Sequence, residues 1–138
     1  MIARALRQCA ILLGLALIPA LVSGAIQLRW HAQEPLAPGE VTVATAQALG
    51  ADVQWVDARS RAKFDHAHIA GALLLNEDEW DVLIAPFLDA WDADKTIVVY
   101  CDGGGCEASH KVADRIRTDL KIGNVYVLKG GWSAWSQK

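Results

Sequence analysis

The length, composition and charge of the chain limit the functions that it can have. With 138 residues, the chain is long enough for one domain. Beyond Trp30 it carries ten Lys and Arg residues against sixteen Asp and Glu residues, a net charge of −6. This acidic balance argues against nucleic acid as a partner, because nucleic acids bind basic surfaces. The two cysteines beyond residue 30 are too few for a disulfide-rich scaffold.

The first 30 residues differ in character from the rest of the chain. Arg4 and Arg7 precede an uncharged stretch of 21 residues, Gln8 to Leu28, which Arg29 closes. A helix of that length crosses a hydrocarbon core of about 30 Å, and the basic residues before it predict a cytoplasmic N-terminus. The alternative is a signal peptide cleaved near Ser23-Gly24-Ala25. We therefore expect a membrane anchor that holds the domain on the extracytoplasmic (periplasmic) side, or else secretion after cleavage.

The remaining residues alternate between short strands and helices. Residues 31–40, which contain two prolines and a glycine, indicate a linker before a domain at 41–138. Branched and aromatic runs predict strands at 41–43, 53–57, 72–75, 96–100 and 125–128. Helical spacing or turn residues predict helices or helical turns at 45–49, 59–65, 78–91, 108–120 and 132–137. We expect an α/β fold: a parallel sheet with helices on both faces, preceded by the N-terminal hydrophobic helix.

Cys101 is the strongest candidate for chemistry. It follows the apolar run 96–100 and precedes three consecutive glycines and a predicted helix. In parallel sheets, sites form beyond the carboxyl ends of the strands. Backbone N–H groups and the helix dipole at such a place favour the thiolate, which is the nucleophilic form of cysteine. The segment therefore predicts covalent sulfur chemistry.

Four motifs, in this order, resemble those of the rhodanese family. They are Trp55-Val-Asp57-Ala-Arg59 for VDxR, Phe64 to Ala72 for F-x-x-GHI-x-GA with Ala67 at the usual glycine, Val98 to Cys101 for the active-site strand, and Lys129 to Trp135 for GG-x-x-x-W. The resemblance covers residues 41–135. It implies a single-domain sulfurtransferase, here a membrane-anchored member, that takes sulfane sulfur from a small donor and passes it to a thiol acceptor.

The resemblance also implies roles for individual residues. Cys101 would carry the persulfide, Asp57 and Arg59 would support the strand end as an ion pair, and Ser109 would either bind the persulfide or cap the helix. The loop that binds substrate would consist of Asp102, Gly103, Gly104, Gly105, Cys106 and Glu107. Where the family loop C-x-x-G-x-R carries arginine, this chain has Cys106. Since a guanidinium suits oxyanions, we expect thiosulfate to be a poorer donor than persulfides or polysulfides.

Several alternatives remain open at the level of sequence. Cys106 either attacks the Cys101 persulfide as a resolving thiol, leaving a disulfide, or is a small residue that fills the arginine position. The chain could be a non-catalytic, membrane-tethered binding module, or a thiol–disulfide oxidoreductase that uses both cysteines. A phosphatase is excluded, because Glu107 stands where a phosphate-binding arginine would be needed. A membrane or redox protein is a further candidate partner.

The histidines indicate no metal site. We expect His68 to be structural and His110 to be a helix residue that is either solvent-facing or able to polarise a donor. His66 and His68 lie two residues apart, and no further ligand accompanies them in the pattern. We expect neither a metal ion nor a cofactor.

Overall fold

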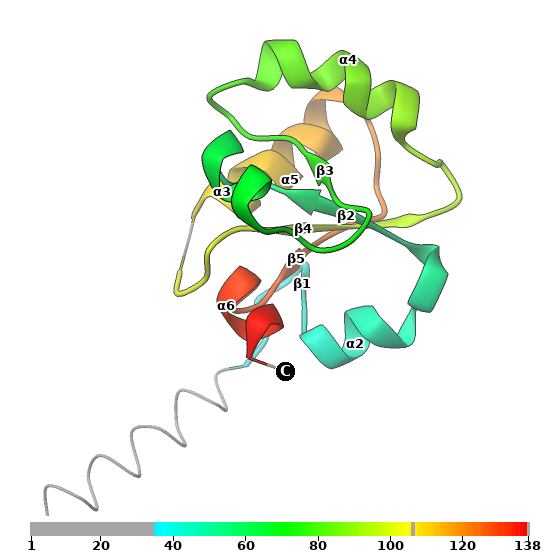
Figure 1. The fold of residues 1–138 in the computed structure, drawn as a ribbon. Coiled ribbons are helices and arrows are strands. Elements are labelled where there is room, and N and C mark those ends of the chain that lie inside the picture. Colours follow the sequence, from blue (N-terminus) through cyan, green and yellow to red (C-terminus); the bar gives the residue numbers. More distant parts are fainter. Residues whose placement is uncertain (1–34, 106, 138) are drawn as a thin grey trace, which may run out of the picture. The chain divides into compact units, whose positions relative to one another are not determined.

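The computed structural model describes residues 35–105 and 107–137 (Figure 1). Residues Leu36–Lys138 form one compact unit, separate from Met1–Pro35. The predicted anchor or signal segment and Cys106 both lie outside the described residues. Within the described ranges, every helix is too short or too polar to cross a membrane.

The centre of the domain is a five-stranded sheet in which all strands are parallel. The order is β1-β5-β4-β2-β3, and β4 pairs with β2 along its whole length. The strands are β1 (Glu40–Val41), β2 (Val53–Asp57), β3 (Leu73–Leu74), β4 (Thr96–Tyr100) and β5 (Val125–Leu128). The last four residues of β4 are fully buried, which explains why this strand is an uninterrupted apolar run.

Helices cover both faces of the sheet, as predicted. In Figure 1, α4 and α5 lie above the sheet and α2 and α6 below it. The helices are α2 (Val43–Ala48), the 3₁₀ turn Gly50–Asp52, α3 (Arg61–His66), α4 (Trp80–Ala90), α5 (Glu107–Asp119) and α6 (Gly131–Ser136). The predicted fold class is therefore confirmed for the described part of the chain.

Alternate residues of β4 supply the two halves of the core. Ile97 and Val99 belong to one cluster, which includes Phe87 of α4 and Ile116 of α5. The opposite face of β4 packs in a second cluster with Ala46 of α2 and the partly buried tryptophans of α6. Because both faces of the strand are held, its carboxyl end is fixed in position.

The structure differs from the sequence prediction mainly at the ends of short elements. The first strand is Glu40–Val41 rather than 41–43, and helix α2 begins at Val43. The cause is Thr42, whose hydroxyl accepts the N–H of Thr45 at 3.1 Å and caps the helix. Glu40, which the sequence assigns to the linker, pairs with Val127 in the sheet.

Helix α4 also starts later than predicted, at Trp80 rather than at residue 78. The side-chain carbonyl of Asn76 accepts the N–H of Glu79 at 2.8 Å, which keeps the preceding residues in a turn. Likewise, only Leu73 and Leu74 of the predicted strand 72–75 pair in the sheet.

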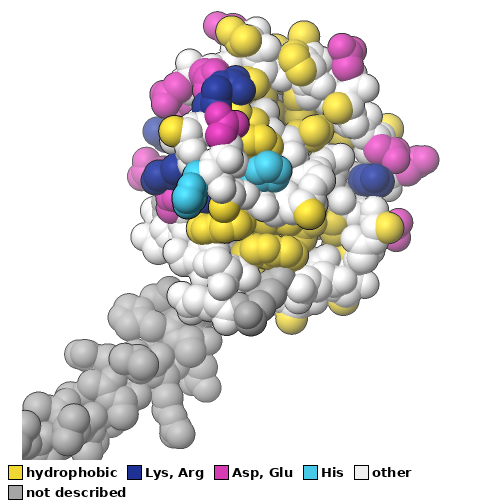
Figure 2. Space-filling model, in the orientation of Figure 1, with side chains coloured by type: hydrophobic (Ala, Val, Ile, Leu, Met, Phe, Trp, Pro, Cys, Tyr) yellow, Lys and Arg dark blue, Asp and Glu magenta, His cyan; other side chains and the backbone are white. Residues whose placement is uncertain are grey.

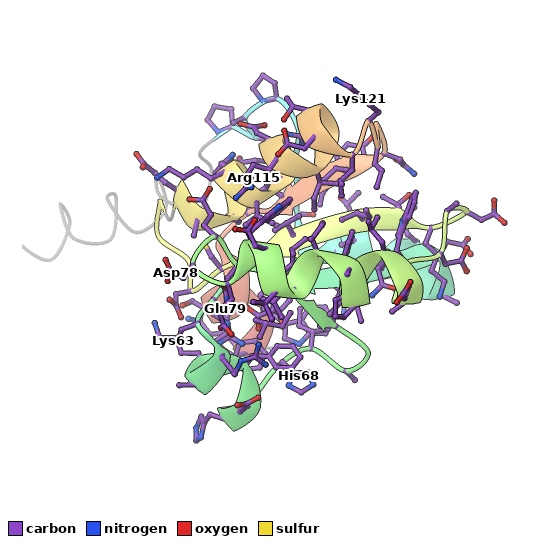
Figure 3. The ribbon with its side chains drawn as sticks, turned by 90° about the horizontal axis from the view of Figure 1, so that it is seen from above. Lys63, His68, Asp78, Glu79, Arg115 and Lys121 are labelled. Carbon is purple, nitrogen blue, oxygen red and sulfur yellow. The ribbon has the colours of Figure 1, made fainter. Side chains whose placement is uncertain are left out.

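Charged side chains on the surface are mostly distributed in small groups. On the face drawn in Figure 2, Lys and Arg side chains lie next to Asp and Glu. Arg61, for example, lies 2.7 Å from Glu79, and this contact links α3 to the start of α4. Arg115 of α5 instead stacks on the ring of Trp80, with its guanidinium carbon 4.0 Å from the ring centroid (Figure 3).

Candidate functional site

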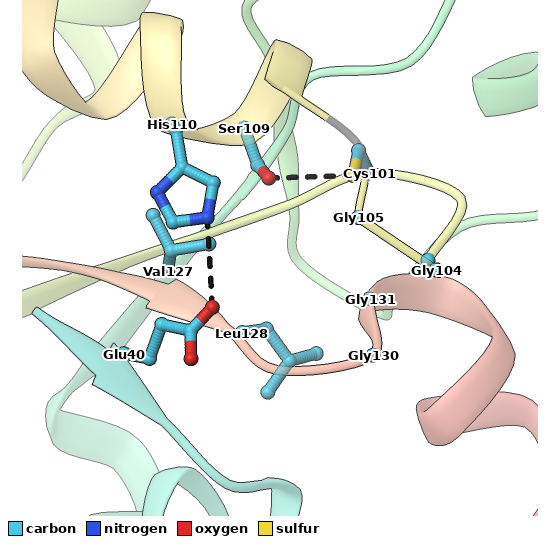
Figure 4. A pocket seen from close by; sticks show the side chains of 11 residues that line it. Glu40, Cys101, Gly104, Gly105, Ser109, His110, Val127, Leu128, Gly130 and Gly131 are labelled. Atoms are coloured by element: carbon cyan, nitrogen blue, oxygen red, sulfur yellow. Dashed lines mark hydrogen bonds and ion pairs between the residues drawn. The ribbon is translucent and has the colours of Figure 1, made fainter. Parts of the chain in front are cut away.

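Cys101 lies directly beyond the carboxyl end of β4 and is buried, with 4% of its surface exposed. Gly103, Gly104 and Gly105 follow it with φ angles of 124°, 64° and 81°. Residues with side chains adopt such angles only at a cost, so the glycines are what allow the chain to curl around the cysteine. The loop then leads to α5, whose first turn faces Cys101 (Figure 4).

A small cavity of about 40 Å³ opens beside the cysteine. That is space for a few water molecules, and hence for the reacting end of a small thiol. Its described lining includes Cys101, the glycines of the loop, Ser109 and His110 of α5, and Glu40 of β1. Elements from both halves of the chain therefore meet at the sulfur.

Ser109 is in direct contact with the cysteine. Its hydroxyl donates a hydrogen bond to the sulfur of Cys101 over 3.3 Å, and its residue is only 2% exposed. Of the two roles expected for Ser109, the structure has the hydrogen bond to the sulfur. A buried hydroxyl donor at this distance stabilises negative charge on sulfur.

The amino end of α6 fixes the first residues of the loop. The N–H of Trp132 donates to the carbonyl of Cys101 over 2.7 Å, and that of Ser133 donates to the carbonyl of Asp102 over 2.9 Å. A Cβ atom on Gly131 would overlap the carbonyl oxygen of Cys101 and lie 2.9 Å from the amide nitrogen of Gly103. The GG motif thus permits the close approach of α6 to the loop.

The predicted ion pair of Asp57 and Arg59 is confirmed. Arg59 Nη2 lies 2.6 Å from Asp57 Oδ2 and donates to the carbonyl of Ala67 over 2.7 Å, and both charged residues are buried. Burial alone would lower the pKa of Arg59, but the hydrogen bond and charge of Asp57 raise it overall. The guanidinium stacks on Trp132, with its carbon 4.5 Å from the ring centroid, so the pair supports the residue that binds the Cys101 carbonyl.

Asp102 and Glu107, the acidic members of the predicted loop, both face outward. Lys63 extends from α3 (Figure 3), and its amino group lies 2.6 Å from Asp102 Oδ2. Glu107 stands in the first turn of α5 and lies 3.8 Å from the amino group of Lys111. The sequence identified no cation in the loop, and the structure adds that α3 supplies one beside it.

Two residues of the cavity were not identified as a pair from the sequence. Glu40 Oε1 lies 3.5 Å from Nε2 of His110, and both residues line the cavity opposite Cys101 (Figure 4). No local pattern marks this contact, because β1 has two residues and no periodicity. Its only signal is that a strand beside β5 would bring the start of the domain to the site.

His68 has the structural role that was expected. Its Nδ1 lies 2.8 Å from the carbonyl oxygen of Phe64, and its ring stacks on the ring of that residue with centroids 4.0 Å apart. Among the described residues, no three His, Cys, Asp or Glu side chains converge as metal ligands would.

Comparison with known proteins agrees with this geometry. The chain is 35% identical over 85 residues to the thiosulfate sulfurtransferase GlpE of Shewanella oneidensis, which is 62% of this chain and 77% of that protein. Its fold resembles the BH2092 protein of Bacillus halodurans (TM-score 0.60, 22% identity, 71% of each chain). It also resembles a rhodanese-related protein of Thermoplasma volcanium (TM-score 0.55, 16% identity, 71% of this chain and 90% of that one). The model of the rhodanese-like domain matches residues 42–138, so the chain belongs to the family of rhodanese-like domains.

Proposed function

We propose that the protein is a sulfurtransferase that carries sulfane sulfur as a persulfide on Cys101 and passes it to a thiol acceptor. The observation that carries this proposal is the hydrogen bond from Ser109 to the buried sulfur, at the edge of a small cavity. The hydroxyl, the N–H groups of the loop and the amino end of α5 all favour a thiolate there. The likeness to GlpE supports the same class of reaction.

The first half-reaction loads the cysteine. The thiolate of Cys101 attacks the sulfane sulfur of the donor, and a new S–S bond forms. The bond between that sulfur and the rest of the donor breaks, and its electron pair leaves with the donor as a thiolate. The sulfur atom changes its carrier without net oxidation or reduction, so no cofactor is needed.

The second half-reaction unloads it. The thiolate of the acceptor attacks the outer sulfur of the persulfide, and the S–S bond to Cys101 breaks. The electron pair returns to Cys101 Sγ, which leaves as a thiolate stabilised by Ser109. The acceptor departs as a persulfide, and the proton of its thiol has gone to solvent.

Persulfides and polysulfides are the donors that this loop favours over thiosulfate. The described loop residues include no guanidinium, and the nearby cation Lys63 is bound to Asp102. Arg59 is held by Asp57 beneath the loop. If the protein turned over thiosulfate and cyanide as fast as persulfide donors, this preference would be refuted.

The direct test is uptake of sulfur, measured by intact mass after incubation with inorganic polysulfide. We expect the wild-type chain to gain the mass of one sulfur atom and Cys101→Ser to gain none. Cys9→Ser, which removes a thiol far from residue 101 in the sequence, is the matched control and should still gain it. Ser109→Ala should load about ten- to a hundredfold more slowly, as expected for the loss of a hydrogen bond to a charged group. If the wild-type chain gains no sulfur, the alternative of a non-catalytic binding module holds instead.

From residues 1–30 we also propose that the chain is anchored in a membrane with its domain on the extracytoplasmic side. The support is the uncharged stretch between Arg7 and Arg29. The domain would then meet donors, acceptors and membrane or redox protein partners outside the cytoplasm. Cell fractionation with an accessibility assay for a tag at Lys138 tests this, since a tag protected in intact spheroplasts contradicts it.

A further inference from the structure

One wall of the Cys101 cavity carries an acidic side chain that the reaction described above does not use. Glu40 is a member of the edge strand β1, and its side chain is only 16% exposed. Its Oε2 accepts the N–H of Ala37 over 2.9 Å, and its Oε1 lies 3.5 Å from Nε2 of His110. The carboxylate is therefore held in a defined place beside the cavity (Figure 4).

This carboxylate still has capacity to bind a ligand. Each carboxylate oxygen can accept two hydrogen bonds, and Ala37 and His110 occupy one site on each. The contact with His110 is long, and the histidine side chain is 47% exposed, so the ring can yield to a ligand with little loss. A positively charged donor would find an oriented partner here.

The two walls of the cavity have opposite polarity. Around Cys101, backbone N–H groups of the glycine loop and the amino end of α5 favour negative charge. At the other side, Glu40 and His110 are the charged or titratable side chains of the described lining, and the residues between them are glycines, Val127 and Leu128. A molecule with a negative sulfur and a positive group close to it matches both walls at once.

We propose that Glu40 makes the site selective for small aminothiols as acceptors, because its carboxylate binds their ammonium group while their sulfur faces Cys101. This inference rests on the proposed sulfur transfer and names its acceptor class. The acceptor enters as an ammonium thiolate, attacks the outer sulfur of the Cys101 persulfide, and leaves as an aminopersulfide. Cys101 recovers the electron pair of the broken S–S bond. A thiol that carries a carboxylate instead is repelled by Glu40.

The size of the effect follows from Coulomb's law. Two unit charges about 6 Å apart, at an effective dielectric constant of about 40, change an equilibrium or rate constant about tenfold. We therefore expect about a tenfold gain for a cationic thiol and about a tenfold loss for an anionic one, relative to a neutral thiol of similar reactivity.

The test measures unloading in a single turnover. The full chain is loaded with sulfur from inorganic polysulfide, desalted and mixed with cysteamine, mercaptoethanol or mercaptopropionate at about pH 8, where imidazole is neutral. Loss of the added sulfur is followed by intact mass. For each thiol, the rate of Glu40→Gln is divided by the wild-type rate, so that the intrinsic acidity of the thiol cancels.

The expected ratios are about one tenth for cysteamine, about one for mercaptoethanol and about ten for mercaptopropionate. Glutamine keeps an oxygen for the N–H of Ala37, and Asp89→Asn, in the last turn of α4, is the matched control that removes a charge outside the cavity lining. All three ratios near one for the control are expected. If Glu40→Gln does not fold, Glu40→Met must give the same order of ratios.

The outcomes separate this inference from the function beneath it. Equal ratios for the three thiols would mean that Glu40 serves only the fold, and the aminothiol inference would be overturned. An equal shift in the Asp89 variant would assign the effect to the net charge of the protein and would overturn it as well. If the wild-type chain cannot be loaded at all, the proposed sulfur transfer itself fails.

Discussion

Replacing Gly131 by alanine should damage the site more than the stability of the domain alone suggests. Gly131 has a φ of 50°, so any side chain there costs about 1 kcal/mol in backbone strain. In addition, its Cβ would overlap the carbonyl oxygen of Cys101, which accepts the N–H of Trp132 over 2.7 Å. Relieving the overlap breaks this buried hydrogen bond and adds about 2 kcal/mol. We expect a total loss of about 3 kcal/mol in the free energy of unfolding.

Gly50→Ala is the matched control. Gly50 has a similar φ of 60°, but a Cβ there meets no atom within 4 Å. It should lose about 1 kcal/mol and load Cys101 with sulfur at the wild-type rate. Gly131→Ala should load about a hundredfold more slowly, because it displaces the cysteine from the loop. Urea unfolding and the mass assay measure the two quantities. Equal losses of stability and wild-type loading in both variants would refute the idea that close contact of α6 positions Cys101.

Other perturbations separate buried from exposed interactions. Arg59→Leu should lower the free energy of unfolding by about 3–5 kcal/mol in urea, because it leaves Asp57 charged and buried without its partner. Lys63→Met removes an exposed ion pair with the loop and should change the same quantity by at most about 1 kcal/mol. Burial raises the pKa of Tyr100, so above about pH 10 the unfolded chain loses this proton first and stability should fall by about 1.4 kcal/mol per pH unit. In urea titrations at two alkaline pH values, Tyr100→Phe should lack this decline and Tyr126→Phe should keep it.

The sequence was most informative where one element is buried on both sides. The strands Val53–Asp57, Thr96–Tyr100 and Val125–Leu128 have the bounds that were predicted. Their apolar runs are continuous because neighbours cover both faces of a parallel sheet. The place of Cys101 followed from the same signal, since a site residue at the end of such a strand needs no long-range information.

The ion pair of Asp57 and Arg59 was also within reach of the sequence. The two residues are separated by a single position, and the charge of one predicts the other as its partner. What the sequence did not contain is the chain of contacts from Arg59 through Trp132 to the carbonyl of Cys101. That chain joins three segments far apart in the sequence, and each link depends on the packed fold.

The short edge strands were the least predictable parts. β1 and β3 have two residues each, which is too few for any period to be visible. Glu40 consequently looked like the end of a linker, although its partner in the sheet, Val127, belongs to a strand that was correctly predicted. The same reason hid its proximity to His110, because that contact exists only after β1 has joined β5.

The positions of these residues divide the site into two parts that can vary separately. The sulfur is held by β4, the glycine loop and α5, and this part is tied to the core through Tyr100 and Ser109, both at most 2% exposed. Glu40 faces the same cavity from an edge strand, and β1 contributes only backbone pairing with β5 at this position. A change at residue 40 therefore alters the charge that a substrate meets without disturbing the cysteine. In this fold, selection of the acceptor can change at the sheet edge while the chemistry at the end of β4 stays as it is.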